Sequence, residues 1–584
     1  MSNQRTTKDI LQEAAKNEAR IPLYNPKALE AIREEFEKWK ATSVREQERK
    51  NWAVTPFAIM GDEIPRKLLY TPLEVADLDY VHDLGFSGDE PYTRGIHANM
   101  YRGRNFTIRP LPGAGSPEEM NSRYKFLISQ GATGLSVALD LPSVQMFDSD
   151  EPESRGNVAV VGVPVDCVQD WEVIFKDIPI DKVSVSIVTH YPRNTAILFP
   201  MYLVMAEKRG IPWDKLPGSV QNDFIMENVV RGAIEYIPPR DCFRIQCDNI
   251  EFIRKEVPLW NYITLNGYNL RENGTSGITS IAVAMANGIA IIDDMKRRGH
   301  DADWVGERIA FFWSFGNDFF SEIASLRAAR RLWYKIMKHR FGAKNPRSML
   351  LRCHIQTSGI SLTREEPLNN IIRAAYHALA AVLGGTQSLH VDTYDEAYSV
   401  PSERTLMPSV QTQHIIESET QTTLTVDPLA GSFFVESLTN EIEEKALNEL
   451  AEIEEMGGIV NAVESGWLHN KIARFTEREQ QQIEKGIKKV VGRNVHQSTD
   501  AELPTIEVSE YDEGKASRMI EKLRKLRKER DNAKVNKCLK ELRDACKRGD
   551  NVTYYTLEAA RANATEGELR QAFTDAFGTW KPPM

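Results

Sequence analysis

Short strand-type segments alternate with helical segments from about residue 130 to residue 400, and this alternation limits the fold more than any other feature. Strands that alternate with helices pair in parallel, because each helix carries the chain back to the same end of the sheet. Eight such segments predict an α/β fold, a (β/α)8 TIM-type barrel with functional side chains at the carboxyl ends of its strands. The predicted strands are GLSVALD (134–140), KVSVSIV (182–188), GSVQN (218–222), CFRIQ (242–246), NYITLNG (261–267), RIAFFWS (308–314), SMLLRCHI (348–355) and TQSLHVD (386–392).

The helical segments between these strands carry clear stop signals. NTAILFPMYLVMAEKRG and GITSIAVAMANGIAIIDDMKRRG both end in basic residues followed by glycine, which marks a helix C-terminus. A chain of 584 residues also exceeds one ordinary core. We therefore expect an N-terminal extension (1–85), the barrel (86–420) and a helical linker with a C-terminal region (421–584).

Small hydroxyl side chains occupy strand positions where branched aliphatic residues usually fill a barrel interior. They are Ser136, Ser184, Ser186, Ser219 and Thr264. Either these side chains face the helices or water, or the barrel is hollow enough to admit a polar chain along its axis.

The chain from Glu513 onward is strongly charged and helical, and we expect it to present a solvated face rather than an anion-binding arm. Its last helix begins with a capping box, Thr565 and Glu568. An apolar stripe follows, which must be buried against this chain or a partner. The stripe consists of Leu569, Ala572, Phe573, Ala576 and Phe577.

Composition excludes several classes of function. The net charge of −10 argues against a nucleic-acid-binding protein. No uninterrupted apolar segment approaches the ~20 residues of a membrane helix, and the first residues lack the apolar core of a secretory signal. Six cysteines without a CxxC pair predict buried thiols and no metal site. We expect a cytoplasmic protein with no membrane or nucleic-acid partner.

Four arginines stand in one short, aromatic-flanked segment, TRGIHANMYRGRNFTIR (93–109). They are Arg94, Arg102, Arg104 and Arg109. The planar guanidinium donates two parallel hydrogen bonds and keeps its charge, so it suits a ligand that carries several phosphates. Such a run is more often a solvated surface, and further motifs are needed to make it specific.

Those motifs occur along nearly the whole chain. They are HANMYRGRNFTIR, GLSVALDLPS with DSD, GSVQND, NGYNLREN, RIAFFW, LRAARRLW, FGAKNPRSM, RCHIQTSG, GGTQSLH with DEA, and DPLAGSFFVE. In this order they resemble the adenosylcobalamin-dependent acyl-CoA mutases, the methylmalonyl-CoA mutase family. The resemblance implies a radical isomerase in which the pantetheine arm of coenzyme A threads the barrel and the cofactor carries the hard chemistry.

The resemblance also assigns roles to residues. It implies a substrate and coenzyme A site formed by His97, Asn99, Met100, Arg104, Thr107, Arg109, Ser136, Ser186, Ser219, Arg308, His354, Gln356, Gln387 and Ser388. Asp392 and Glu396 match positions that receive the adenosyl ribose. The residues expected around the reacting acyl group are Tyr268, Asn269, Leu111, Arg231 and Gln221.

Two features bear on the substrate. Pro110, Leu111 and Pro112 stand where the family usually has glutamine followed by tyrosine, phenylalanine or isoleucine, which predicts a wider and more apolar pocket. Arg231 lies ten residues after Gln221, where methylmalonyl-type enzymes hold an arginine against the free carboxylate. Together they favour a branched or alkyl-substituted dicarboxylic acyl-CoA, with methylmalonyl-CoA/succinyl-CoA as the family default.

Other departures leave alternatives open. The family's Gly-Tyr-His triplet ends here in Asn269, which can donate an N–H but cannot transfer a proton near neutral pH. His97 instead favours an isobutyryl-type, monocarboxylic mutase. Asn269 and Pro110 also permit a non-catalytic scaffold subunit. Ala138 stands where 2-hydroxyisobutyryl-type mutases carry aspartate, which disfavours that substrate.

No Asp-x-His-x-x-Gly occurs, the motif with which the family offers histidine to cobalt. We therefore expect the large subunit of a split mutase, in which a separate small subunit binds most of the adenosylcobalamin. The expected assembly is a hetero-oligomer.

Overall fold

The computed structural model describes residues 5–50, 64–109, 113, 115–129, 134–230, 232, 234–399, 401–498 and 511–583. Within these residues the strands form two parallel sheets, in the orders β1-β9-β8-β7-β6 and β2-β3-β4-β5. The strands are β1 (Thr107–Ile108), β2 (Gly134–Val137), β3 (Ser184–Ile187), β4 (Gly218–Val220), β5 (Trp260–Asn261), β6 (Ile263–Asn266), β7 (Ile309–Phe315), β8 (Arg352–Thr357) and β9 (Ser388–His390).

The two sheets are not closed into one barrel. At one seam the N–H of Thr264 in β6 donates to the carbonyl of Gln221, directly after β4, at 3.0 Å. At the other seam no ladder joins β1 to β2 among the described residues. The predicted α/β fold with parallel strands is confirmed, whereas a TIM barrel goes beyond what the strand pairing establishes.

Helices separate the strands, as the alternation predicts. They are α4 (Met100–Gly103), α5 (Pro117–Ser129), α6 (Leu141–Gln145), α7 (Val168–Ile174), α8 (Pro192–Lys208), α9 (Pro239–Glu256), α10 (Tyr268–Glu272), α11 (Gly277–Arg297), α12 (Ala302–Gly306), α13 (Phe319–Lys335), α14 (Pro346–Met349) and α15 (Asn369–Gly384). The stop signals are confirmed: Gly210 and Gly299 follow α8 and α11 with φ of 68° and 91°.

One predicted strand is wrong. Residues 242–246 lie inside α9, which has Pro239 in its first turn. Buried positions 242, 245, 249 and 253 follow one another three or four residues apart, which is helical spacing. The short strand β1 was not predicted, because two residues carry no alternation.

Helix α11 is long and apolar enough, by length and composition alone, to cross a membrane. In the structure 83% of its most apolar window is buried inside the protein. That burial is typical of a core helix, and it explains why α11 is apolar on all sides.

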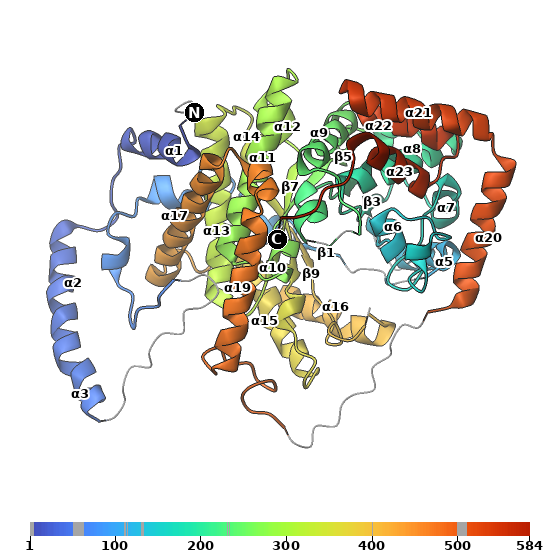
Figure 1. Cartoon of the computed structure of the whole chain (residues 1–584). Helices are drawn as coiled ribbons and strands as arrows, with labels where there is room; N and C mark the ends of the chain where they lie inside the picture. The colour runs from blue at the N-terminus through green and yellow to red at the C-terminus, as the bar shows by residue number, and fades with distance from the viewer. Residues whose placement is uncertain are drawn as a thin grey trace.

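Further helices precede and follow the sheets. The N-terminal ones are α1 (Thr7–Lys16), α2 (Pro26–Trp39) and α3 (Arg45–Arg49), and α2 and α3 project at one side of the molecule (Figure 1). After β9 come α16 (Glu403–Ser418), α17 (Phe433–Glu455), α18 (Ile459–Glu464) and α19 (Trp467–Glu484). The C-terminal arm, as we call residues 511–583, contains α20 (Glu513–Glu529), α21 (Asn532–Arg548), α22 (Val552–Arg561) and α23 (Glu566–Phe577).

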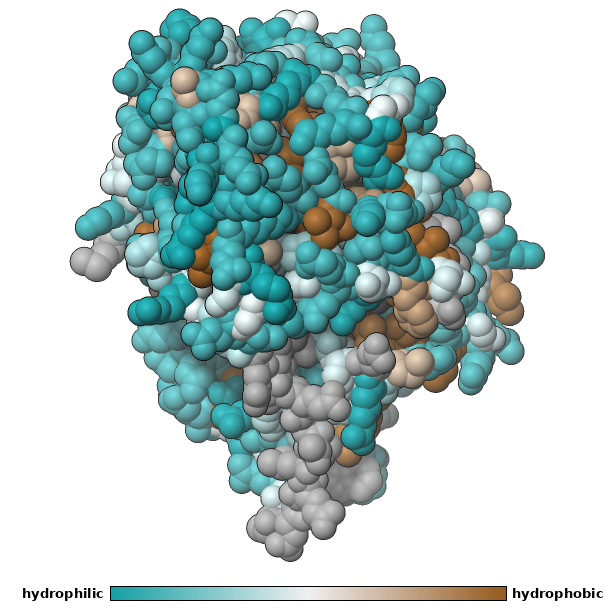
Figure 2. Space-filling model, turned by 90° about the vertical axis from the view of Figure 1, so that its right-hand side faces the viewer, coloured by the Kyte–Doolittle hydropathy of each residue, from teal (hydrophilic) through white to brown (hydrophobic). Residues whose placement is uncertain are grey.

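The C-terminal arm packs on this chain itself. Leu569, Ala572 and Phe573 of α23 are fully buried, and Thr565 and Glu568 form the predicted capping box. The outward side of the molecule here is largely hydrophilic (Figure 2). The apolar stripe is therefore satisfied within the chain.

The basic side chains of α20 are not simply solvated, which corrects the prediction. Arg527 donates to Asp148 and Asp150 at 2.6 and 2.7 Å. Lys522 donates to the buried Asp170 at 2.6 Å. These ion pairs tie the arm to the loop after α6 and to α7 itself, so part of its basic charge is structural.

Candidate functional site

A cavity of about 320 Å³ opens at the amino-terminal ends of β6, β7 and β8. Arg104, Arg109, Arg308 and Arg352 line it, and no aspartate or glutamate is among the described residues of its wall. We call this cavity the cationic pocket. It brings together ten predicted residues: His97, Met100, Arg104, Thr107, Arg109, Ser219, Arg308, His354, Gln387 and Ser388.

The arginines of the cationic pocket lack carboxylate partners within the described chain. Arg352 donates instead to the carbonyls of Glu307 and Arg347, both at 2.8 Å. Burial, together with Arg347 and Arg308, lowers the pKa of Arg352 to about 10. Burial also lowers the pKa of Arg308, whose Nε–H has no acceptor. An anionic ligand would relieve both conditions.

Strand β8 places polar side chains along its length, from one end of the sheet toward the other. Arg352, His354 and Gln356 are two residues apart, so they share one face. Arg352 and Gln356 are four positions apart, which is about 13 Å at the usual rise of a strand. The sequence prediction missed Arg352, although the same alternation from His354 could have found it.

His354 is held as a neutral imidazole. Its Nδ1 is 2.9 Å from the hydroxyl oxygen of Ser388. Burial, then Arg109 and His390, holds its pKa well below the usual range. A neutral histidine can donate or accept one hydrogen bond without adding charge to the pocket.

Serine hydroxyls continue the polar wall across the second sheet. Ser136 is in register with Ser186, and Ser186 with Ser219. The hydroxyl of Ser219 donates to that of Ser186 at 3.1 Å. Ser219 and Thr264 both line the cationic pocket, so these hydroxyls face the space between the sheets rather than the helices.

Aromatic rings connect this pocket to the carboxyl end of β6. Phe312 lies between His354 and Tyr268, with ring centroids 5.1 and 4.5 Å away. The Tyr268 ring stacks on Phe312 at an interplanar angle of 10°. Phe312, which the sequence prediction missed, thus joins two predicted residues at different levels.

The orientation of the Asn269 amide follows from its neighbour Asn266. The backbone N–H of Asn269 donates to Oδ1 of Asn266 at 2.8 Å, so the other amide atom of Asn266 must be its NH2 group. That group donates to Oδ1 of Asn269 at 3.1 Å. The NH2 group of Asn269 is therefore left to donate, and no acceptor for it lies among the described residues.

Acidic side chains gather at the carboxyl ends of β8 and β9. Gln356 donates to Oδ1 of Asp392 at 2.7 Å, while Oδ2 of this buried carboxyl has no hydrogen-bond partner in the described part of the chain. Burial, Glu396 and Glu272 hold the pKa of Asp392 well above its usual range. Desolvation and Glu272 raise the pKa of Glu396 to about 7. Such acceptors are suited to ligand hydroxyl groups, which include those of a ribose.

Several predicted residues lie elsewhere. Asn99 is exposed and outside the pocket wall. Gln387 does line the pocket, but its amide is engaged by backbone groups, the N–H of Cys353 and the carbonyl of Gly385. Gln221 directly follows β4, and its buried Oε1 has no partner. Leu111 and Arg231 lie outside the described residues.

Two of the four arginines in the 93–109 segment are not ligand groups in this pocket. Arg94 donates to the Tyr80 hydroxyl at 2.9 Å and pairs with Asp427 at 3.4 Å. Arg102 is exposed and does not line the pocket. Pro110 and Pro112 lie outside the described residues.

Thiols and carboxylates do not add a metal site to this picture. All six cysteines are free and buried, as predicted. Within the described ranges, no group of histidine, cysteine, aspartate or glutamate side chains could hold a metal ion.

Comparison with known proteins gives a consistent family. The methylmalonyl-CoA mutase family profile matches residues 60–579. The chain is 37% identical to the "2-hydroxyisobutanoyl-CoA mutase large subunit" of Aquincola tertiaricarbonis, over 95% of this chain and 98% of that protein. It is 39% identical to methylmalonyl-CoA mutase of Cereibacter sphaeroides, over 88% of this chain and 72% of that protein. For the mitochondrial enzyme of Homo sapiens the identity is 38%, over 88% and 68%.

Proposed function

The chain belongs to the methylmalonyl-CoA mutase family of isomerases, and from this premise we propose that it binds and isomerises an acyl-CoA as the large subunit of a two-subunit, adenosylcobalamin-dependent mutase. The partner we propose is a small cobalamin-binding subunit. This assembly extends to the present chain the large-subunit name of one relative. The relatives are mutases, and this favours an enzyme over a non-catalytic scaffold subunit.

The observation that carries the proposal is the cationic pocket, whose described wall has four arginines and no acidic residue. Coenzyme A carries a pyrophosphate and a 3′-phosphate, and guanidinium groups bind such groups through paired, charged hydrogen bonds. We place these phosphates against Arg104, Arg308 and Arg352. The pantetheine arm would then pass Ser219 and His354 toward Tyr268.

This path requires a closed barrel, which we propose as the complete architecture. Its eight strands would be β1, β2, β3, β4, β6, β7, β8 and β9. The hydrogen bond from Thr264 to Gln221 supports closure at one seam. The other seam would join β1 to β2, on either side of residues that the structure does not describe.

At the reacting end, the chain supplies orientation and hydrogen bonds. The free NH2 group of Asn269 would donate to the thioester carbonyl and withdraw charge from it without transferring a proton. Tyr268, stacked on Phe312, would form one apolar wall. His354, kept neutral, would hydrogen-bond the acyl-CoA chain without neutralising the arginines.

The carboxyl-end acids suit the adenosyl group of the cofactor. Oδ2 of Asp392 and the carboxyl of Glu396 would accept hydrogen bonds from the ribose hydroxyls. Adenosylcobalamin, when bound, supplies the radical chemistry that removes and returns a substrate hydrogen. The chain's own part is to bind the substrate, orient it and exclude water.

For the substrate we propose a branched or alkyl-substituted dicarboxylic acyl-CoA. Leu111 favours a wide apolar pocket, and Arg231 favours a free carboxylate. Ala138, in place of an aspartate, disfavours 2-hydroxyisobutyryl-CoA. His97, which favoured a monocarboxylic substrate, lies with Arg104 and Arg352 at the amino-terminal ends of the strands. We place the coenzyme A phosphates there, so His97 is weaker evidence about the acyl group. A cytoplasmic location remains our prediction, in keeping with the free cysteines.

Two exposed arginines of one segment test the coenzyme A site. Arg104→Ala should weaken coenzyme A binding about tenfold, because a charged hydrogen bond to phosphate is lost. The control Arg102→Ala removes the same charge two residues away, outside the pocket, and should change affinity little. Calorimetric titration of the chain with coenzyme A measures both. Equal losses in the two variants would reject the pocket as the binding site.

Turnover of the complex with its small subunit tests the substrate. Alkylsuccinyl-CoA should be isomerised faster than methylmalonyl-CoA, and a clear methylmalonyl-CoA preference would reject the enlarged pocket. Arg231→Gln separates the acyl classes: a dicarboxylate enzyme should lose most of its turnover, whereas an isobutyryl-type enzyme should lose little.

A further inference from the structure

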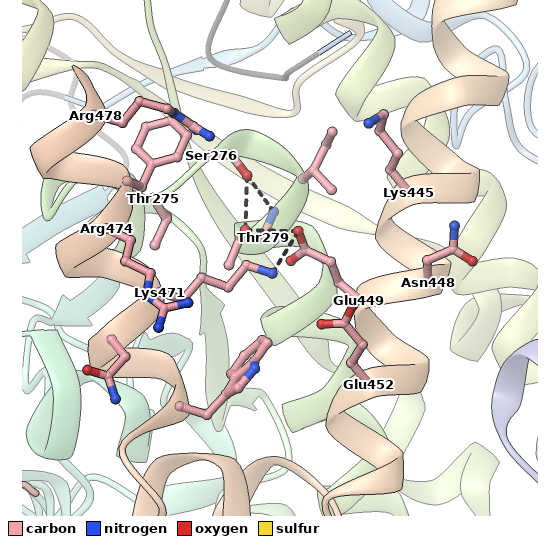
Figure 3. Close-up of a pocket in the computed structure, with 14 residues that line it drawn as sticks. Thr275, Ser276, Thr279, Lys445, Asn448, Glu449, Glu452, Lys471, Arg474 and Arg478 are labelled. Atoms are coloured by element: carbon pink, nitrogen blue, oxygen red, sulfur yellow. Dashed lines mark hydrogen bonds and ion pairs between the residues drawn. The ribbon is translucent and has the colours of Figure 1, made fainter. Parts of the chain in front are cut away.

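A second and larger cavity, of about 580 Å³, lies between the N-terminus of α11 and the helices α17 and α19. None of its lining residues belongs to the cationic pocket or to the acidic cluster after β8 and β9. We call it the α11 pocket. Figure 3 shows side chains of α17 and α19 facing one another across it, with Ser276 and Thr279 between them.

The N-terminus of α11 offers unused donors. Ser276 caps the helix by accepting the N–H of Thr279 at 3.0 Å. The N–H groups of Gly277 and Ile278 have no acceptor among the described residues, as expected for the first positions of a helix. This end of a 21-residue helix also carries the positive end of its dipole.

A buried hydroxyl on the wall is also unsatisfied. Thr275 lines the α11 pocket and is only 3% exposed, yet its Oγ1 has no hydrogen-bond partner among the described residues. Buried polar atoms are rarely left unpaired, so this hydroxyl indicates that a ligand completes the wall.

The charge of the wall is predominantly positive. Its basic residues are Lys445, Lys471, Arg474 and Arg478, and its acidic residues are Glu449 and Glu452. Lys471 forms an ion pair with Glu449 at 3.0 Å, and Glu449 also accepts a hydrogen bond from the Thr279 hydroxyl at 3.3 Å (Figure 3).

Two of these cations remain for a ligand. Lys445 on α17 and Arg474 on α19 have no carboxylate partner within the described chain, and they stand on opposite sides of the pocket. Ligand charge would therefore be held from two helices at once.

We propose that the α11 pocket binds the phosphate group of a small organic phosphate, or free phosphate. Lys445, Arg474 and the open N–H groups of α11 hold the phosphate. The Thr275 hydroxyl donates to it. This site lies apart from the acyl-CoA path and does not depend on its assignment.

Hydrogen–deuterium exchange of the full chain locates such binding. Potassium phosphate and AMP should each slow exchange in residues 275–279, 445–452 and 467–478, whereas adenosine and potassium chloride at equal ionic strength should not. Tighter protection by AMP than by phosphate identifies an organic phosphate, and equal protection identifies the free ion. Protection by adenosine alone, protection confined to residues 97–109 and 352–354, or none, would overturn the proposal.

Matched variants test the residues. The double variant Lys445→Ala/Arg474→Ala should weaken protection by phosphate at least about tenfold. The control Arg524→Ala/Lys525→Ala removes the same two charge types from exposed positions on α20 and should leave it unchanged. An equal effect of both double variants would show general electrostatic attraction and overturn the site.

Thr275→Val guards against a folding artefact. It removes a hydroxyl that has no hydrogen-bond partner among the residues that the structure describes, so thermal stability should not fall. Phosphate protection should nevertheless weaken about fivefold, the value of one hydrogen bond. A loss of stability with unchanged phosphate protection would show that the hydroxyl is structural and overturn its role.

Discussion

Asn266 and Asn269 form a buried pair in which hydrogen bonding decides which atom of Asn269 is free. The chain of donors is fixed by a backbone N–H, so the assignment does not depend on how either amide was placed. Asn266 is in turn fixed by its own backbone N–H, which donates to the buried Asp223 at 2.8 Å. Oδ1 of Asn266 therefore fixes the orientation of the pair and leaves the NH2 group of Asn269 free to donate. This NH2 group is the donor that we assign to the thioester carbonyl.

Loss of this pair should show in turnover. Asn269→Ala should lower kcat about 100-fold, because a donor to developing charge is lost. Asn266→Ala should lower kcat about tenfold with little change in KM, because it only loosens that donor. If Asn266 acts through Asn269, the double variant is no slower than Asn269→Ala. Multiplied losses in the double variant would contradict a positioning role.

Asp223 predicts a dependence of stability on pH. Burial raises its pKa to about 7, whereas an unfolded aspartate titrates near ~3.9. Between these values the folded chain binds more protons, so this group's contribution to stability falls as pH rises from about 4 to about 7. As the pH rises over that range, the thermal midpoint of the wild type should therefore fall relative to that of Asp223→Asn. A constant difference would contradict the shifted pKa.

At the scale of elements, β8 shows what the sequence can and cannot provide. Alternation predicts that Arg352, His354 and Gln356 share a face, and motif similarity selects two of them. It cannot show that β8 joins a cationic end to an acidic end, because this depends on strand register with β7 and β9. The same limit applies to Phe312, whose contacts with Tyr268 and His354 are tertiary.

The helices also show that local signals can be predicted from the sequence, whereas long-range contacts cannot. Terminal signals such as Gly210 and Gly299 are local and were predicted correctly. The strand proposed at 242–246 was wrong, because five residues cannot distinguish a strand from one face of an 18-residue helix. The pairing of Arg527 with Asp148 joins residues almost 400 positions apart, and no local pattern reveals it.

The ion pairs of α20 predict the stability of the C-terminal arm. Arg527→Ala leaves the buried Asp148 without its cation, which should lower the free energy of unfolding by about 1–3 kcal/mol, since Arg527 is partly exposed. The exposed control Lys525→Ala should change it by less than about 0.5 kcal/mol. Calorimetry measures both thermal midpoints. Equal shifts would mean that the arm is not held by this pair.

For the whole molecule, the alternation of strands and helices predicted the α/β class, and motif order predicted the family. The sites fall at both ends of the parallel sheets: the cationic pocket lies at the amino ends, and the acidic cluster lies at the carboxyl ends. The alternation of strands and helices predicts only a site at the carboxyl ends. Motif similarity predicts the residues of the amino-end site, and the ligand path that we propose, which enters at one end and reacts at the other, accounts for both positions.

The most direct measurement of the central claim is isomer formation by the purified chain with a small cobalamin-binding subunit, adenosylcobalamin and a panel of acyl-CoA substrates. Mass spectrometry of the acyl-CoA products measures the amount of isomer formed. We predict an isomerised dicarboxylic acyl-CoA that forms only when both subunits and the cofactor are present, and that is greatly reduced with Asn269→Ala. No isomer from any acyl-CoA, with coenzyme A still bound in the cationic pocket, would contradict the account.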